Sequence, residues 1–409
     1  MSEIRRFRPL RPPAAIAPEV ASVPYDVIDT DEARALAAGK PRSFLHVIRP
    51  EIDLPEGTDL HDDAVYEKGA ENFHRFLQEG WLLEDAEPGF LVYRLVREGQ
   101  AQVGVVACCS VDEYDAGLIV KHEKTRPDKE DDRTRHLLTM SAHAEPVFLA
   151  HPPDAAIVRT LEATTATGPL LDFTADDGVR HTLWRALDPA RLEQLYRALP
   201  RIYVADGHHR SASASRARGE RQRVNPAHNG REAYNSFLAV IFPADQLRIL
   251  PYNRLVADLA GRTPAAFLAA VPREMGVTPA ADGTPQKRGE VRVYVAGRWH
   301  SLHLFGEREA RPQDAVQALD ITRLQEQVLA PLLGIHDPRT DLRIEFVGGA
   351  RGTGALSERV DRGKAAVAFS LYPTSMDELM AVADSGRVMP PKSTWFEPKL
   401  RSGLFVHRF

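Results

Sequence analysis

The sequence predicts an α/β protein of mixed α+β composition, with a core and a second, inserted α+β lobe. Helical patterns alternate with paired strand patterns along the first part of the chain. A short apolar run, 202–205, leads through a turn signal into a helix. At 409 residues the chain is also too long for one minimal core. We therefore expect a core over residues 1–255, an inserted lobe over 256–350 and a C-terminal segment, 351–409, that returns to the core.

The first part of the core is predicted to combine helices with a β-hairpin. Gly39 and Gly80 follow amphipathic stretches and are typical helix ends. Two runs rich in β-branched residues flank a short loop that contains Gly99, which is typical of a hairpin. The expected elements are helices over 31–38 and 62–78, a strand over 45–50, and hairpin strands over 90–96 and 102–111.

The remaining elements follow from the same signals. Pro127 fits the first position of a helix, and the acidic residues after it suit the helix dipole. The turn 348–354 is rich in glycine, but it lacks the Gly-Lys-Ser/Thr ending of a P-loop and the spacing of a dinucleotide fingerprint. The expected helices are 127–140, 189–199, 208–218 (ended by Gly219), 264–270, 315–333 and 375–383, and the expected strands are 202–205, 234–243, 247–254, 291–295, 299–304, 343–347 and 365–371.

The composition excludes several classes of protein. A formal net charge of −5 argues against broad binding to nucleic acids or anionic membranes, so any anion site must be local. We find no helix-turn-helix signature, no apolar run of roughly 20 residues and no signal peptide pattern, and we expect a cytoplasmic protein. The two cysteines, Cys108 and Cys109, are adjacent in an apolar strand pattern and are predicted to be core residues.

The stretch Asp206-Gly207-His208-His209-Arg210 carries the clearest chemical signal. It places two histidines and an arginine in the first turn of a helix, where unpaired backbone N–H groups and the helix dipole favour an anion. Arg210 adds a guanidinium fork that matches a phosphate. The alternative is that Asp206 only caps the helix and the histidines are surface residues. A zinc site of His208, His209 and Asp206 is a weaker hypothesis, because adjacent histidines point in different directions.

A charged segment, 121–126, precedes the predicted helix that begins at Pro127. It contains Lys121, His122, Glu123 and Arg126, together with a further lysine and a threonine. Charge pairing along a helix does not explain these residues, because they precede the helix. Their groups suit the binding of phosphate and the transfer of a proton, and we favour a functional role for Glu123.

These residues identify a family resemblance that extends over nearly the whole chain. The chain resembles the bacterial and archaeal family DUF1015 in four segments: 24–28, 121–133, 206–210 and 389–400. The segment 206–210 is also similar to the phosphate-binding signature of the ParB/sulfiredoxin-like superfamily. That resemblance implies a nucleotide-binding α/β core and phosphoryl transfer, with free L-serine as the best-known small substrate. Two positions depart from the DUF1015 pattern, namely Ser211 in place of an aromatic residue and Asn253 in place of a histidine.

The resemblance and the residue chemistry together predict the site residues. Phosphoryl transfer needs cations at the phosphates, a divalent metal and a group that activates the nucleophile. The predicted catalytic residues are Glu123, Asp206, His208 and His209; the predicted phosphate or nucleotide ligands are Gly207, His208, His209, Arg210, Lys121, Arg126, Lys392, Ser393 and Thr394; the predicted substrate ligands are Tyr25, Asp26, His122 and Arg133; and Asp206 and Glu123 are the predicted Mg²⁺ ligands.

Two functions remain open at this stage. The first is a nucleotide-dependent phosphotransferase, with ATP or ADP as co-substrate and free L-serine as a candidate acceptor, or the related phosphohydrolase. The second is a nucleotide-binding regulatory switch without turnover of a small molecule. Sulfiredoxin chemistry is disfavoured, because histidines stand where that reaction needs a cysteine.

Overall fold

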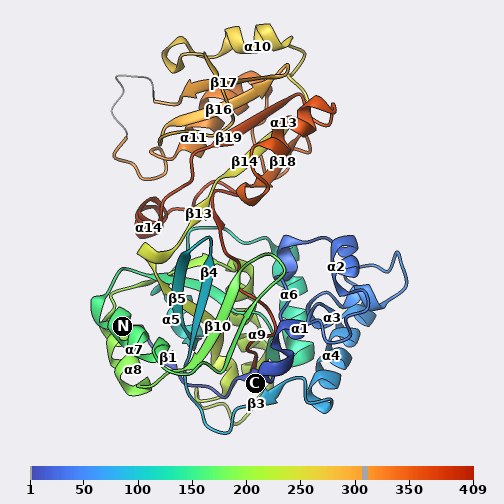
Figure 1. The fold of residues 1–409 in the computed structure, drawn as a ribbon, viewed down its shortest axis with the longest axis vertical. Helices are drawn as coiled ribbons and strands as arrows, with labels where there is room; N and C mark the ends of the chain where they lie inside the picture. The colour runs from blue at the N-terminus through green and yellow to red at the C-terminus, as the bar shows by residue number, and fades with distance from the viewer. Residues whose placement is uncertain (1, 306–311) are drawn as a thin grey trace. The chain divides into compact units, whose positions relative to one another are not determined.

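The computed structural model describes residues 2–305 and 312–409, and the chain divides into two compact units. The first unit comprises Met1–Leu247 and Pro398–Phe409, and the second comprises Arg248–Glu397 (Figure 1). The second unit is thus an insertion in the sequence of the first. It extends beyond the expected lobe, 256–350, because strands Tyr252–Val256 and Val367–Leu371 pair within its own sheet.

The first unit is built around a mixed sheet, which confirms the α/β prediction. Its strands follow the order β6-β11-β8-β12-β5-β4-β10-β9, and β1 pairs with β5. The pairs β6/β11 and β8/β12 are parallel, whereas the other pairs are antiparallel. The strands are β1 (Ile4–Arg5), β4 (Leu91–Arg97), β5 (Gln100–Ser110), β6 (Ile119–Val120), β8 (Val147–His151), β9 (Leu171–Thr174), β10 (Arg180–Arg185), β11 (Ile202–Asp206) and β12 (Ser236–Pro243).

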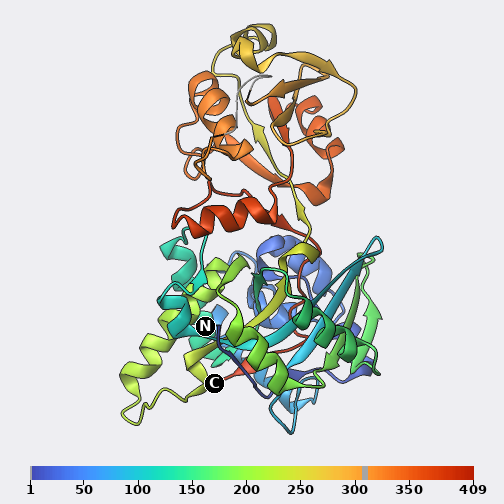
Figure 2. The same cartoon turned by 90° about the vertical axis from the view of Figure 1, so that its left-hand side faces the viewer.

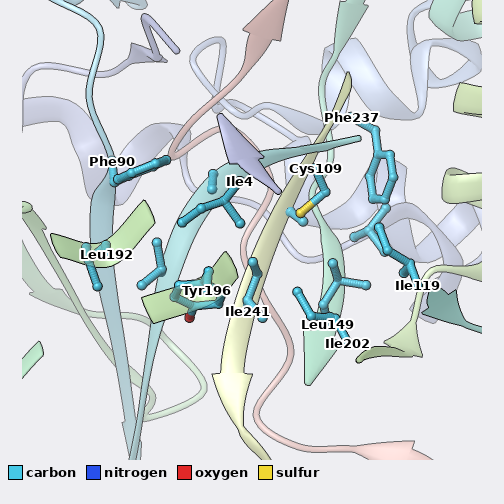
Figure 3. Close-up of a cluster of buried hydrophobic side chains, with 14 of the residues drawn as sticks. Ile4, Phe90, Cys109, Ile119, Leu149, Leu192, Tyr196, Ile202, Phe237 and Ile241 are labelled. Carbon is cyan, nitrogen blue, oxygen red and sulfur yellow. The ribbon is translucent and has the colours of Figure 1, made fainter. Parts of the chain in front are cut away.

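One hydrophobic core lies between this sheet and the helices α7 (Ala155–Thr165) and α8 (Pro189–Ala198). Figure 3 shows side chains of the sheet close to side chains of α8, with Tyr196 of α8 beside Ile241 of β12. Cys109 belongs to the same cluster, and both cysteines are buried free thiols, as predicted. Burial raises the pKa of both thiols, so they stay protonated and unreactive and serve as apolar core residues.

A second core joins the N-terminal helices to the end of the chain. It contains residues of α3 (Leu45–Ile48), α4 (Asp63–Gln78) and α6 (Pro127–Met140), together with Val406. Leu10 and Val406 form a β-bridge, so the first and last segments of the chain lie side by side (Figure 2). The strand predicted over 45–50 is wrong, because a short buried apolar run does not distinguish a strand from a helical turn.

Most other helices have the predicted positions. The helix predicted over 31–38 is α2 (Thr30–Ala37), and α6 begins at Pro127 as expected. Helix α9 (His208–Val224) begins where predicted but continues through Gly219, which lies within it. An isolated glycine in a helix costs only about 1 kcal/mol relative to alanine, and this one does not end the helix.

The second unit has an antiparallel sheet of its own. Its strand order is β15-β17-β16-β19-β14-β18, and β13 pairs separately with β20. The strands are β13 (Ile249–Leu250), β14 (Tyr252–Val256), β15 (Thr278–Ala280), β16 (Glu290–Val295), β17 (Arg298–His303), β18 (Ile344–Gly348), β19 (Val367–Leu371) and β20 (Trp395–Phe396), and the helices include α10 (Pro264–Ala270), α13 (Gly354–Asp361) and α14 (Met376–Asp384). The helix predicted over 315–333 begins at Asp320 and contains a π-helical turn at Gln325–Leu329. Within the described ranges of the chain, no helix has the length and apolarity that crossing a bilayer requires.

Candidate functional site

The junction between β11 and α9 forms the centre of the candidate site. Gly207 is the N-cap of α9 and has φ +97°, in the left-handed region that favours glycine. As a glycine it provides no side-chain cap, although a polar side chain at the N-cap commonly binds the first free N–H groups of a helix. A Cβ atom at Gly207 would lie only 3.0 Å from Nε of Arg210. The absence of a side chain therefore leaves the helix end open for an anion.

Asp206 pairs with cations and does not act as the N-cap. Its Oδ2 accepts a hydrogen bond from Lys399 Nζ at 2.9 Å, and its Oδ1 lies 3.7 Å from Nη2 of Arg210. Burial by itself would raise the pKa of Asp206, but Lys399 and Arg210 together hold it well below its usual value. Asp206 is thus a stably ionised carboxylate that positions two cations.

Arg210 extends from the first turn of α9 into a largely buried environment. Its Nη1 donates a hydrogen bond to the carbonyl oxygen of Pro146, and its Nη2 lies 3.7 Å from Asp26 Oδ2. The Nε–H group is buried without a hydrogen-bond partner in the described parts of the chain. Burial opposes the charge of Arg210, but Asp26 and Asp206 outweigh it and raise its pKa. The guanidinium therefore keeps its charge and has a donor to spare.

A second guanidinium lies in the same region. Arg133 stacks over the ring of Tyr25, with Cζ 4.2 Å from the ring centroid, and its Nη1 is buried without a hydrogen-bond partner over residues 2–305 and 312–409. Burial raises the pKa of Glu145, although Arg210 and Arg133 both oppose the rise. Arg133, Glu145 and Arg210 line one cavity of about 30 Å³, which is enough for about one water molecule.

His122, Glu123 and His208 form a separate cluster next to the helix end. The two imidazole rings meet edge to face, with centroids 4.4 Å apart. The backbone N–H of His122 contacts His208 Nε2 at 3.4 Å, and His208 Nδ1 lies 3.9 Å from Glu123 Oε2. Burial lowers the pKa of His122 to about 4, and it lowers the pKa of His208 as well. Both imidazoles are therefore neutral at physiological pH.

The other predicted residues of segment 121–126 contribute differently from one another. The backbone N–H of Arg126 donates to His209 Nε2 at 3.1 Å, whereas its guanidinium pairs with Asp128. Lys121 places its Nζ 4.0 Å from the centroid of the Tyr114 ring, and its phosphate-binding role stays a prediction. The segment thus reaches the start of α9 through His122, Glu123 and the backbone of Arg126.

Lys392, Ser393 and Thr394 belong to the second unit. The carbonyl oxygen of Lys392 accepts a hydrogen bond from the buried Arg254 at 2.8 Å, and Ser393 Oγ donates to Pro390 at 2.6 Å. Asn253 is also structural, since its Oδ1 accepts the backbone N–H of Leu371 at 3.1 Å. The roles of Lys392, Ser393 and Thr394 in nucleotide binding stay predictions.

Two residues of the site were not among the predicted ligands. Lys399 lies in one of the segments that carry the family resemblance, so the ion pair with Asp206 could have been suggested from the sequence. Glu145 accepts hydrogen bonds from the backbone N–H of Tyr25 at 3.2 Å and from Ser402 Oγ at 3.0 Å. It is a single carboxylate next to a proline, and no local pattern distinguishes it.

Comparisons with known proteins identify a family model and several solved structures. The model described as "Protein of unknown function (DUF1015)" matches residues 4–322. A comparison with functionally curated proteins gave no match.

The solved structures are similar to this chain at low sequence identity. A free serine kinase in complex with AMP has 11% identity and a TM-score of 0.36, with 72% of this chain and 86% of that chain covered. SbnI from Staphylococcus aureus, truncated at its C-terminus, has 14% identity and a TM-score of 0.39, with 73% and 85% covered. A conserved hypothetical protein from Pyrococcus furiosus has 12% identity and a TM-score of 0.34, with 73% and 93% covered. Likenesses at this level do not transfer an activity to this chain.

Proposed function

This chain belongs to the DUF1015 family, and we propose that its first unit binds a nucleotide and transfers a phosphoryl group to, or from, a small hydroxyl substrate. The proposal covers a kinase that uses ATP or ADP, with free L-serine as the candidate acceptor, and the related phosphohydrolase.

The observation that carries the proposal is the uncapped start of α9 with fixed cations beside it. The helix end presents backbone N–H groups and the positive end of the helix dipole, which favour a phosphate. Arg210 begins in the same turn and has a buried Nε–H without a partner in the described chain. Lys399 lies close to Arg210, because both cations pair with the carboxylate of Asp206. Backbone donors and cations held in advance of the reaction are what phosphoryl transfer requires, because charge spreads over the phosphate oxygens in the transition state.

Glu123 is the best candidate for the base that activates the hydroxyl group. Its side chain is 36% exposed, so a substrate can reach it, and it lies 3.9 Å from His208. Asp206 suits this role less well, because Lys399 and Arg210 lower its pKa and weaken it as a base. We therefore assign Asp206 to positioning Arg210 and Lys399, and we assign His208 and His209 to hydrogen bonding at the helix end.

The predicted Mg²⁺ ligands differ in how well they fit that ion. Both oxygens of Asp206 already face cations, namely Lys399 and Arg210. The carboxylate of Glu123 is the more suitable oxygen ligand, and Mg²⁺ commonly takes only one or two carboxylates in addition to substrate phosphates. When bound, the ion would neutralise phosphate charge.

Tyr25, Asp26 and Arg133 surround the substrate side of the proposed site. Nη1 of Arg133, buried without a partner in the described chain, offers a donor for a carboxylate, and Asp26 offers an acceptor for an ammonium group. An amino acid with a hydroxyl group presents both of these groups. This complementarity supports free serine as the first substrate to test.

The test is a direct measurement of turnover. The purified protein is incubated with Mg²⁺, L-serine and ATP, ADP or CTP, and the phosphorus signals are followed by ³¹P NMR. We expect a phosphomonoester signal that requires both serine and nucleotide, and nucleotide hydrolysis without serine would instead indicate the phosphohydrolase. Tight nucleotide binding without turnover for any hydroxyl amino acid would contradict the proposal and favour the regulatory switch.

A further inference from the structure

Three potential metal ligands converge beside the start of α9. His122, Glu123 and His208 each offer one ligand atom, and these atoms lie within 4.8 Å of one another. Two ligands are adjacent residues that follow β6, and the third is the first residue of α9. Such a separation of the ligand atoms is compatible with an ion between them after small side-chain movements, because metal–nitrogen and metal–oxygen bonds are about 2.0–2.2 Å long.

One ring nitrogen of His122 forms no hydrogen bond in the part of the chain that the structure describes. His122 is 2% exposed, and its Nδ1 is buried without a hydrogen-bond partner there. This nitrogen is therefore available as a ligand atom. A buried polar atom without a partner is costly, and a ligand would relieve that cost.

The other two ligands already face each other. His208 Nδ1 and Glu123 Oε2 are 3.9 Å apart, which is too long for a hydrogen bond but leaves room for a cation between them. An ion bound to Nδ1 would shift the imidazole proton to Nε2, and the 3.4 Å contact from the backbone N–H of His122 would be lost. That contact is long for a hydrogen bond, so its loss costs little.

We propose that His122, Glu123 and His208 bind one divalent transition-metal ion of the class that prefers imidazole ligands, such as Zn²⁺ or Co²⁺. Two imidazoles and one carboxylate select such ions over Mg²⁺, which prefers oxygen ligands in octahedral geometry. Three protein ligands leave a further position open for water or a substrate oxygen, as in catalytic zinc sites. With this ion bound, Glu123 acts as its ligand in place of the role as base or Mg²⁺ ligand considered above, and the ion polarises the bound oxygen.

This inference goes beyond the proposed function and does not depend on it, because it concerns binding of the metal in the absence of nucleotide. Turnover without transition-metal binding would overturn only the present inference. Metal binding without turnover would overturn only the proposed function.

The experiment is a metal titration of the full-length protein after treatment with a chelator. Co²⁺ binding is followed by its visible absorption, and Zn²⁺ and Mg²⁺ binding by calorimetry. We expect one Zn²⁺ per chain, visible bands typical of nitrogen and oxygen ligands for Co²⁺, and much weaker binding of Mg²⁺ alone. Equal affinity for Mg²⁺ and Zn²⁺, or no binding of Zn²⁺, would overturn the proposal.

Variants test whether the bound ion occupies this cluster. Glu123→Gln removes a partly exposed ligand and should preserve the fold, whereas His122→Asn also tests the buried ligand. Each is expected to weaken Zn²⁺ binding by about 10- to 100-fold or more. The matched control is His74→Asn, because His74 is an exposed histidine of α4 whose Nε2 contacts the Gln78 side chain. An unchanged affinity in Glu123→Gln, with circular dichroism like that of the wild type, would refute the site.

Discussion

Lys399, Asp206 and Arg210 show how single residues create the chemistry of the candidate site. Each alone would be an unfavourable charge in a largely buried place, and together they compensate one another. The arrangement keeps two cations next to the open helix end. A phosphate would therefore meet groups that are already charged and oriented.

Replacement of Lys399 by methionine is expected to change both the carboxylate and the site. Without its nearest cation, the pKa of Asp206 should rise, because Lys399 is the largest opposing influence on the effect of burial. The pKa can be followed by carboxyl ¹³C NMR, and nucleotide affinity by calorimetry, which should fall by about 10-fold or more. Lys68→Met is the control, because Lys68 pairs with Glu71 on an exposed face of α4. An unchanged pKa for Asp206 would refute this account of the pair.

At the residue scale, the sequence predicts the types of group better than their partners. Asp206 ends β11 and Arg210 lies in the first turn of α9, so their proximity follows from the short strand-to-helix turn between them. Glu145 meets Arg133 and Arg210 only through the tertiary fold. Local patterns contain no information about such contacts, and Glu145 was therefore not predicted.

The decisive element is the transition from β11 to α9, which depends on Gly207. Its positive φ is strained for residues with a side chain, and a Cβ atom would press on Arg210 at 3.0 Å. Gly219 lies in the same helix, and a Cβ atom at that position would have no described atom within 4 Å beyond its own helix backbone and chain neighbours. Gly207 is therefore required by the backbone conformation and by the contact with Arg210, whereas the position of Gly219 can accept a side chain.

Alanine substitutions at these two glycines should have opposite effects. Gly207→Ala is expected to lower the free energy of unfolding by about 1–3 kcal/mol and to weaken phosphate binding by displacing Arg210. Gly219→Ala should raise the free energy of unfolding by about 0.5–1 kcal/mol, because alanine is the better helix former. Urea denaturation measures both changes. Equal effects of the two substitutions would show that Gly207 has no special conformational role.

At the element scale, the sequence identified the strand and the helix of this junction but not the end of the helix. A glycine signals a C-terminus only when the chain turns there, and packing of α9 against α6 carries the helix past Gly219. The same limit applies to 45–48, where buried Leu45, Val47 and Ile48 form a helical turn. Tertiary packing overrides a weak local preference in both places.

Across the first unit, buried neutral histidines should make the stability depend on pH. Burial lowers the pKa of His136 and His181 to about 3 and that of His407 to about 4, from an ordinary value of 6.5. The unfolded chain therefore binds more protons between pH 6.5 and about 4, so the free energy of unfolding falls as the pH falls through this window. Each histidine contributes up to about 3 kcal/mol to that loss at the lower end.

Urea denaturation between pH 7 and pH 5 measures this dependence. His407→Gln keeps a donor for the carbonyl oxygen of Ala233 but does not titrate, so its stability should fall less steeply than that of the wild type. A stability that is constant over this range would contradict neutral burial of these histidines.

At the scale of the whole molecule, length and element order predict a core over 1–255, an inserted lobe over 256–350 and a C-terminal segment over 351–409, whereas the structure divides into Met1–Leu247 with Pro398–Phe409 and Arg248–Glu397. The boundaries were harder to predict, because strand pairing decides them. Residues 252–255 were predicted to end the core, yet they belong to β14, which pairs with β18 and β19 in the second unit. The C-terminal segment 351–409 was predicted to return to the core site, and one of its residues, Lys399, forms an ion pair with Asp206 within the first unit.

The most direct test of the central claim is the affinity of Arg210→Gln for nucleotide. Arg216 of the same helix is the control, because it is partly exposed and pairs with Glu130 and Asp131. Calorimetric titration of both variants with Mg²⁺ and ATP or ADP, with their fold verified by circular dichroism, should show a loss of about 100-fold or more for Arg210→Gln and little change for Arg216→Gln. Wild-type affinity in a folded Arg210→Gln protein would contradict a phosphate site at the start of α9.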